Sequence, residues 1–325
     1  MQYIDINRTN IKEAKEQHYL FMRYIIKKKL NGANFSEHPP ISQMNQINRI
    51  SNIHLLDQEV ILFLNDECNL KKVLIGTPEE LDTIKSVFSS VSQVNTINKI
   101  LKYKVWINKE EDSTYKKYNA YHLAEKLDIP TCVYCNRIYT KTVITGLYKK
   151  ITRPTFDHWF PKSKYPLLSL SFHNLIPSCS VCNCGVKGDT PFSIDTHFHP
   201  YYINPNNHFK YRFSYDHVDY NRFSFKIITE HGDEFSKRSI EAFELEEIFK
   251  AHEDEIEDLR KIKDAYSDEY INILESQILG GINLDRDEIY RLAFGVHFQE
   301  AKFDRRPLSK MKKDILVELG VIITT

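Results

Sequence analysis

The residues best suited to chemistry lie close together, between Cys132 and Gly188. This stretch holds two Cys-x-x-Cys pairs, one Asp-His dipeptide and two separate asparagines. The residues concerned are Cys132, Cys135, Cys179, Cys182, Asp157, His158, Asn174 and Asn183. Thiolates are preferred ligands of zinc, whereas carboxylate and amide oxygens are ligands of Mg²⁺ or Mn²⁺. The stretch therefore carries ligands for two different kinds of metal ion.

The paired cysteines predict a structural zinc site. Each Cys-x-x-Cys presents two thiolates across a tight turn, and four sulfurs complete a tetrahedral zinc without an open position for catalysis. Five of the six cysteines lie in this stretch, and Cys68 lies far upstream. In a reducing compartment such clustering favours metal over disulfides. A redox-active Cys132–Cys135 pair and buried free cysteines are the alternatives, and Cys184 is a spare thiolate.

The Asp-His dipeptide predicts a second, catalytic metal centre. Asp157 and His158 follow an apolar approach and precede a loop, so we expect both side chains at a strand end. Asn183 directly follows Cys182 on a predicted short helix over 179–187. One Asp oxygen and one Asn oxygen, completed by water and phosphate oxygens, suit a single Mg²⁺ or Mn²⁺ ion. The neutral imidazole of His158 would then be free to act as a general base.

The motifs DHWFPKSKYP, SFHNLIPSC and CNCGVKG resemble those of the HNH, or ββα-metal, endonuclease family. The paired cysteines match the zinc-containing branch of that family, and the motifs cover about sixty of the 325 residues. The resemblance implies that His158 is the general base and that Asn174 braces the loop carrying it. It also implies that Asp157 and Asn183 bind the catalytic metal, with Asn183 at a position where His is commoner.

The same resemblance implies a reaction and a biological setting. The expected reaction is hydrolysis of nucleic-acid phosphodiester bonds, with DNA favoured and RNA the other candidate, leaving 5′-phosphate and 3′-hydroxyl ends. More loosely, the longer pattern resembles HNH subunits of bacterial anti-phage systems such as Septu, which work beside an ATPase. The implied partners are therefore nucleic acid and an ATPase subunit. The long flanks, which carry no catalytic constellation, are predicted to dock such a partner or to form a homo-oligomer.

Two other functions are compatible with the cysteine pattern. A zinc-dependent nucleic-acid-binding or assembly module without catalysis needs only the four cysteines and a basic surface. It gives no reason for the Asp-His pair and the spaced asparagines to occur together. A redox protein using Cys132 and Cys135 would show a reversible thiol–disulfide couple.

Charge is unevenly distributed, although the formal net charge of the chain is zero. Between residues 136 and 188 the basic residues greatly outnumber the single acid, Asp157. They are Arg137, Lys141, Lys149, Lys150, Arg153, Lys162, Lys164 and Lys187. Residues 241–258 are strongly acidic instead. A basic centre with acidic flanks can hold a polyanion locally. Lys162 and Lys187 are predicted to contact phosphate groups, with a solvated surface position as the alternative.

The elements that must position these residues predict an α+β fold with mainly helical flanks. Helices are predicted over 10–31, 115–127, 236–279, 285–294 and 308–319. Another helix is predicted to start at Pro78, after Thr77 as its N-cap. Hairpins are predicted over 137–153 and 211–229, while 60–65 is compatible with strand or helix. We expect a helical scaffold or partner-docking region at 1–115, an HNH nuclease domain at 116–200 and a mainly helical region at 201–325.

The sequence also predicts a cellular location. It contains no continuous apolar run of membrane-spanning length. Its first residues, MQYIDINRTN, lack the basic start and apolar core of a secretory signal. We therefore expect a cytoplasmic protein that does not insert into membranes.

Overall fold

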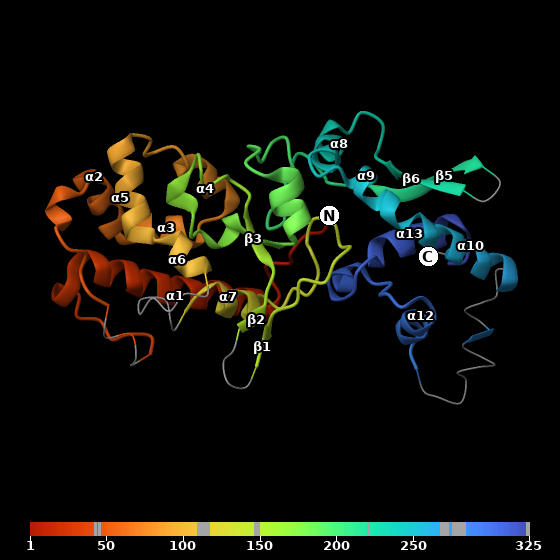
Figure 1. Cartoon of the computed structure of the whole chain (residues 1–325), viewed down its shortest axis with the longest axis horizontal. Helices are drawn as coiled ribbons and strands as arrows, with labels where there is room; N and C mark the ends of the chain where they lie inside the picture. The colour runs from red at the N-terminus through yellow and green to blue at the C-terminus, as the bar shows by residue number, and fades with distance from the viewer. Residues whose placement is uncertain are drawn as a thin grey trace.

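The structure, a computed structural model, describes residues 1–41, 44, 47–108, 118–145, 150–219, 222–266, 273–274 and 284–322. These residues form a mixed α+β fold that is mostly helical, with three small two-stranded antiparallel sheets. Figure 1 shows an elongated molecule with the N-terminal helices at one end and the C-terminal hairpin and helices at the other. The short strands of the central stretch lie between them, as the predicted fold class requires.

The N-terminal region is helical, as predicted. Its helices are α1 (Thr9–Asn31), α2 (Gln58–Asn65), α3 (Glu67–Ile75), α4 (Pro78–Ile84), α5 (Val91–Leu101) and α6 (Tyr103–Ile107). The undecided segment 60–65 is helical because the Asp57 carboxylate caps the N–H of Val60 at 3.2 Å. The predicted start of α4 is confirmed, since Thr77 and Glu80 form a capping box.

The central stretch combines one helix with two short hairpins. It contains α7 (Ala120–Leu127), β1 (Val143–Ile144), β2 (Lys150–Thr152), β3 (Thr155–His158), β4 (Leu175–Ser178) and the helical segment η6 (Val181–Lys187). The predicted hairpin over 137–153 is confirmed only as the short β1–β2 pair. Its turn at 146–149 and the predicted helix start at 115–117 lie outside the described residues.

The C-terminal region contains the predicted hairpin and a broken series of helices. The elements are β5 (Arg212–Asp219), β6 (Arg222–Ile228), α8 (Glu234–Glu241), α9 (Leu245–Phe249), α10 (Glu253–Tyr266), α12 (Arg286–Phe294) and α13 (Ser309–Glu318). The helical pattern over 236–279 is interrupted at Glu244, whose φ of 46° is incompatible with a continuous helix. Most of 267–279 lies outside the described residues.

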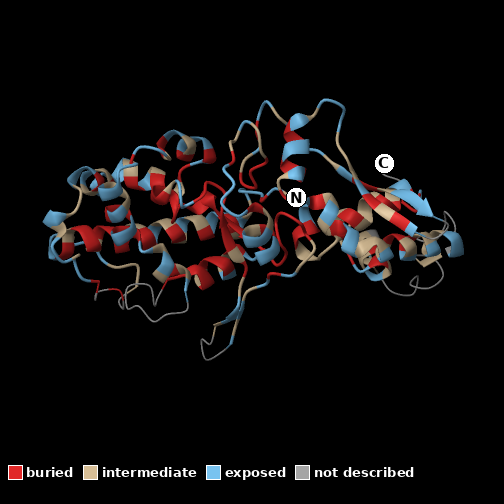
Figure 2. Ribbon diagram, turned by 45° about the horizontal axis from the view of Figure 1, so that its top comes forward, coloured by how far each residue is buried: buried red, intermediate tan, exposed pale blue. Residues whose placement is uncertain are grey.

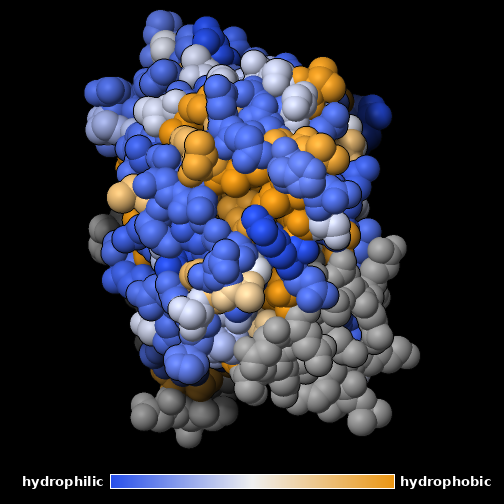
Figure 3. Space-filling model, turned by 90° about the vertical axis from the view of Figure 1, so that its left-hand side faces the viewer, coloured by the Kyte–Doolittle hydropathy of each residue, from blue (hydrophilic) through white to orange (hydrophobic). Residues whose placement is uncertain are grey.

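Two hydrophobic clusters form the core of the described residues (Figure 2). The first runs from Met1 to Leu245 and so joins the N-terminal helices to the central stretch across the predicted boundary at residue 115. The second packs β5 and β6 against α10, α12 and α13. Apolar side chains also gather at the surface on the end of the molecule seen in Figure 3. None of the described helices has the length and apolar character needed to cross a membrane.

Asn136 joins the central stretch to the C-terminal region. It lies directly after Cys135 with a positive φ of 53° and is buried. Its amide donates to Phe303 O at 2.8 Å, and its Oδ1 accepts from the N–H of Ser309 at 3.1 Å. Its own carbonyl accepts from the N–H of Leu308 at 2.7 Å. Asn136 therefore holds the second hydrophobic cluster against the first cysteine pair.

Replacing Asn136 by Ala should lower the free energy of unfolding by about 2–4 kcal/mol, because buried backbone groups lose their partners. Urea denaturation followed by far-UV circular dichroism would measure the change. Asn34→Ala, at an exposed position, should change stability by less than about 0.5 kcal/mol. Equal effects of the two substitutions would contradict the role assigned to Asn136.

Candidate metal centre and active site

The four paired cysteines converge in the structure. Cys132 and Cys135 lie on a turn closed by the bond from Asn136 N–H to Cys132 O at 2.8 Å, and Cys179 and Cys182 lie where β4 passes into η6. All four are buried, and their sulfurs lie within 4.8 Å of one another. Four sulfurs bound tetrahedrally at 2.3 Å from zinc would lie about 3.8 Å apart, and the Cys135 and Cys179 sulfurs are 3.9 Å apart.

Local backbone geometry prepares these sulfurs to bind a cation. The N–H of Arg137 donates to the Cys135 sulfur at 3.4 Å, and the N–H of Cys182 donates to the Cys179 sulfur at 3.5 Å. Four buried thiolates would repel one another and lose their hydration, so they can gather here only around a positive charge. The cluster is therefore consistent with a zinc site, whereas exposed Cys184 lies outside it.

The cysteine cluster lies beside a ββ-helix unit. Strand β3 pairs antiparallel with β4, placing Asp157 opposite Ile176 and His158 opposite Leu175. The predicted strand end is confirmed, because Asp157 and His158 are the last two residues of β3. The helix predicted over 179–187 is present as η6, a π-helical segment that contacts β3. π-Helical turns occur frequently at functional sites.

His158 is held in one orientation by the loop that follows β3. Its Nε2 lies 2.9 Å from Ser169 O. A carbonyl oxygen only accepts hydrogen bonds, so Nε2 carries the proton and the neutral ring keeps its lone pair on Nδ1. Burial lowers the pKa of His158 to about 3. Tyr103 of α6 packs edge-on against the imidazole, with ring centroids 4.5 Å apart.

Asn174 bridges the two ends of the loop after His158. Its Oδ1 accepts from the N–H of Phe160 at 2.6 Å, and its Nδ2 donates to Phe160 O at 3.1 Å and to Leu168 O at 3.0 Å. The side chain is fully buried and uses both ends of its amide. These bonds are the ones that the predicted bracing role needs.

Asp157 is buried between two protein donors. Its Oδ2 accepts from the Tyr134 hydroxyl at 2.6 Å, and its Oδ1 accepts from Lys187 Nζ at 3.1 Å. Lys187 also donates to His158 O at 2.9 Å. Burial raises the pKa of Asp157, and the charge of Lys187 opposes that change. The phosphate contact predicted for Lys187 stays a prediction. The ammonium is buried and already has these two partners.

The remaining predicted residues lie around this buried group. Asn183 is partly exposed on η6, and its backbone N–H donates to Cys179 O at 3.0 Å. Lys162 is exposed on the loop after β3, with Nζ 5.9 Å from the centroid of the Tyr103 ring. The structure thus brings the Lys187 ammonium into contact with the Asp157 carboxylate and the backbone carbonyl of His158, and it places Asn183 on the helix that carries Lys187.

Two residues of this site were not predicted from the sequence. Tyr134 lies between the two cysteines of the first pair, where its position alone indicates only a turn residue. Tyr103 comes from the N-terminal region, to which the sequence analysis assigned no chemistry. Only the folded contacts reveal that Tyr134 reaches Asp157 and that Tyr103 covers His158.

Comparison of the chain with protein-family models, with curated proteins and with solved structures finds no match. Assignment of a function therefore depends on the residues and geometry of this chain.

The cysteine cluster predicts a definite zinc content. Purified protein should contain about one zinc ion per chain, and Cys182→Ser should lose it and unfold at a lower temperature, because a serine oxygen is a poor substitute for a thiolate ligand. Elemental analysis and thermal denaturation would measure both properties. Cys184→Ser is the matched control and should keep its zinc. Zinc retained by Cys182→Ser would contradict the site.

The contact between Tyr134 and Asp157 can be tested with Tyr134→Phe. Loss of a hydrogen bond to a charged acceptor should lower the free energy of unfolding by about 1.5–3 kcal/mol, while zinc content stays unchanged. Tyr139→Phe, at a side chain that is 59% exposed, should leave both unchanged. Urea denaturation and elemental analysis suffice, and loss of zinc in Tyr134→Phe would mean that the hydroxyl supports the cysteine turn rather than Asp157.

Proposed function

We propose that this protein is a metal-dependent HNH endonuclease that hydrolyses phosphodiester bonds in nucleic acid, with DNA the favoured substrate. The observation that carries the proposal is the adjacent position of buried Asp157 and His158 at the end of a β-hairpin, next to a helix that starts at the cysteine cluster. A zinc-binding module that does not cleave has no use for a buried carboxylate and a buried imidazole at these positions.

In this proposal the Asp157 carboxylate is one oxygen ligand of a hard divalent ion. An ionised carboxylate has about four acceptor positions, and Tyr134 and Lys187 use two of them. The Asn183 amide would supply a second oxygen ligand from η6. Mg²⁺ or Mn²⁺ prefers such oxygen donors and would stabilise negative charge on the phosphate and the leaving oxygen.

His158 supplies the proton acceptor in this proposal. With Nε2 bound to Ser169 O, its Nδ1 is the atom that takes a proton from an attacking water. Asn174 holds the loop that bears Ser169 and Phe160, so it keeps the imidazole oriented without touching the substrate. Exposed Lys162 and Lys164 lie on the same loop and would attract the phosphate backbone.

A role in anti-phage defence beside an ATPase subunit follows from the resemblance of the motifs alone. Docking of a partner, or formation of a homo-oligomer, follows from the length of the flanking regions and from the absence of a catalytic constellation in their sequence. These partners, like the cytoplasmic location, stay predictions.

The test is cleavage by the purified protein in Mg²⁺ or Mn²⁺. Substrates should include plasmid DNA, single-stranded DNA and total tRNA, each with and without cellular extract that could supply a partner. His158→Ala should reduce cleavage at least about 100-fold, because it removes the general base. Exposed His231→Ala should cleave like the wild type.

Zinc content and thermal denaturation should be the same in all three proteins, so that a loss of cleavage is not a loss of folding. Wild-type protein that cuts none of the substrates, or His158→Ala that cuts equally well, would contradict the proposal. Nucleic-acid binding that is unchanged in His158→Ala, without cleavage by the wild type, would identify the non-catalytic module instead.

A further inference from the structure

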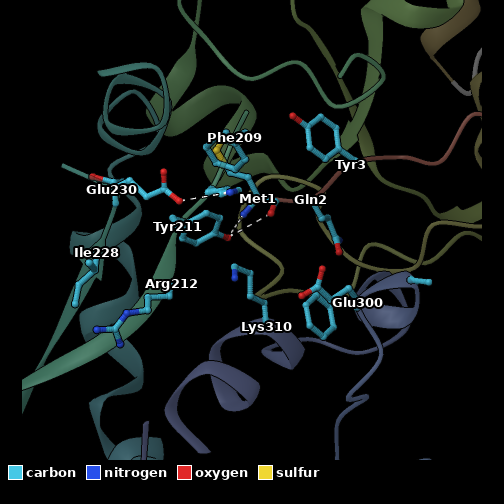
Figure 4. Close-up of a pocket in the computed structure, with 14 residues that line it drawn as sticks. Met1, Gln2, Tyr3, Phe209, Tyr211, Arg212, Ile228, Glu230, Glu300 and Lys310 are labelled. Carbon is cyan, nitrogen blue, oxygen red and sulfur yellow. Dashed lines mark hydrogen bonds and ion pairs between the residues drawn. The ribbon is translucent and has the colours of Figure 1, made fainter. Parts of the chain in front are cut away.

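A cavity of about 690 Å³ lies apart from the candidate active site. Its walls come from the N-terminal segment, the entry of β5, the end of β6, the helical segment η10 (Glu300–Arg305) and α13 (Figure 4). None of the predicted catalytic or zinc-binding residues lines it. The cavity lies where the first core cluster meets the second, and its volume is within the range of small-molecule sites, which often occur at such junctions.

Aromatic rings form one wall of this cavity. Tyr3, Phe209 and Tyr211 line it together, and the Phe209 and Tyr211 centroids are 5.3 Å apart. The Tyr3 ring packs edge-on against Phe198 and is still 36% exposed. Figure 4 shows these three rings around the cavity, which Phe303 also lines. Tyr3 is exposed and Phe209 and Tyr211 are partly buried, and aromatic rings that reach the surface stack favourably on planar bases.

Cationic side chains form the opposite part of the lining. Lys310 projects into the cavity from α13, with Nζ 4.6 Å from the Tyr211 ring centroid (Figure 4). Its carboxylate partner, Asp314, is 3.0 Å away and does not line the cavity. Lys210 and Arg212 reach the same space from β5 and its approach.

Asp314 holds Lys310 at 3.0 Å and Glu318 holds Arg212 at 2.8 Å, whereas Lys210 is left available to an anion. The Lys210–Glu230 pair is 3.4 Å long, and its side chains are 64% and 70% exposed, so water competes strongly and the pair contributes little. Glu300, the other acid of the lining, lies 3.0 Å from Lys313 and is directed to that partner. A phosphate group can therefore approach Lys210 by competing only with an exposed ion pair, whereas on Lys310 it shares the ammonium with Asp314, in a pair whose side chains are 20% and 14% exposed.

We propose that this cavity binds a nucleotide unit, with the base against Tyr3, Phe209 and Tyr211 and the phosphate on Lys310 and Lys210. The ligand is either a free mononucleotide or one nucleotide of a single strand, since both present a planar base joined to an anionic phosphate. The site is independent of the proposed nuclease centre.

Isothermal titration calorimetry without added divalent metal tests the proposal. The titrants are AMP, adenosine, inorganic phosphate and an oligodeoxyadenylate of about twelve residues, long enough to span an aromatic and cationic surface. AMP or the oligonucleotide should bind saturably, and adenosine and phosphate should each bind at least about tenfold more weakly, because each lacks one half of the recognised unit.

Two pairs of variants locate the binding. Lys310→Gln should weaken binding about tenfold, since it removes a charged donor. Lys312→Gln, on the same helix but outside the cavity, should not. Tyr3→Ala should also weaken binding, whereas Tyr139→Ala, at an exposed ring, should have no effect. Thermal denaturation of each variant separates weaker binding from unfolding.

The results distinguish a free nucleotide from a single strand as the ligand, and they can overturn the proposal. Tighter binding of AMP identifies a free nucleotide, and tighter binding of the oligonucleotide identifies a single strand. In both cases Lys310→Gln must weaken the preferred titrant. The proposal fails if neither titrant binds at millimolar concentration, if inorganic phosphate binds as tightly as AMP, or if Lys310→Gln and Lys312→Gln behave alike. Because these measurements do not involve cleavage, they are unaffected if the nuclease proposal fails.

Discussion

The convergence of the four cysteine sulfurs is the constraint on which the central stretch depends. It brings together two segments more than forty residues apart in the sequence, and each segment carries a residue that contacts Asp157. Tyr134 lies inside the first Cys-x-x-Cys turn, and Lys187 lies on the helix that follows the second. A metal ion at the cluster would therefore hold the two segments together. It would also fix the positions of both hydrogen-bond donors to the Asp157 carboxylate.

Burial of the Asp157 carboxylate costs free energy. A carboxylate removed from water loses its hydration, and one neighbouring charge seldom compensates in full. Here the Lys187 ammonium and the Tyr134 hydroxyl share the carboxylate, and Tyr134 is itself stacked on Phe243, with ring centroids 4.1 Å apart. The C-terminal region consequently helps to position a residue of the candidate active site. Asn136 makes the same connection through backbone groups of η10 and α13.

Much of this site could be predicted from the sequence because its residue types are chemically distinctive and closely spaced. The cysteine pairs, the strand ending at His158 and the helix after Cys182 were all predictable in this way. Tyr134 and Tyr103 were not, because an aromatic residue on a turn or helix is compatible with ordinary packing. The burial of Lys187 was also missed, since a lysine in a basic stretch is usually solvated. Its position depends on the packing of η6 against β3, which is a tertiary contact.

The N-terminal region supports the site more directly than a docking scaffold would. Three groups on the loop 169–174 bond to it: Leu170 O accepts from His18 Nε2 at 2.7 Å, His173 Nδ1 donates to Gly76 O at 2.6 Å, and the Ser171 hydroxyl donates to Val73 O. The same loop contains Ser169, whose carbonyl orients His158, and Asn174, which closes the preceding loop. The cysteine cluster fixes β4 and η6 but makes no contact of this kind with the loop. Orientation of the imidazole therefore needs the N-terminal helices, and residues 116–200 alone do not contain all the contacts that build the candidate active site.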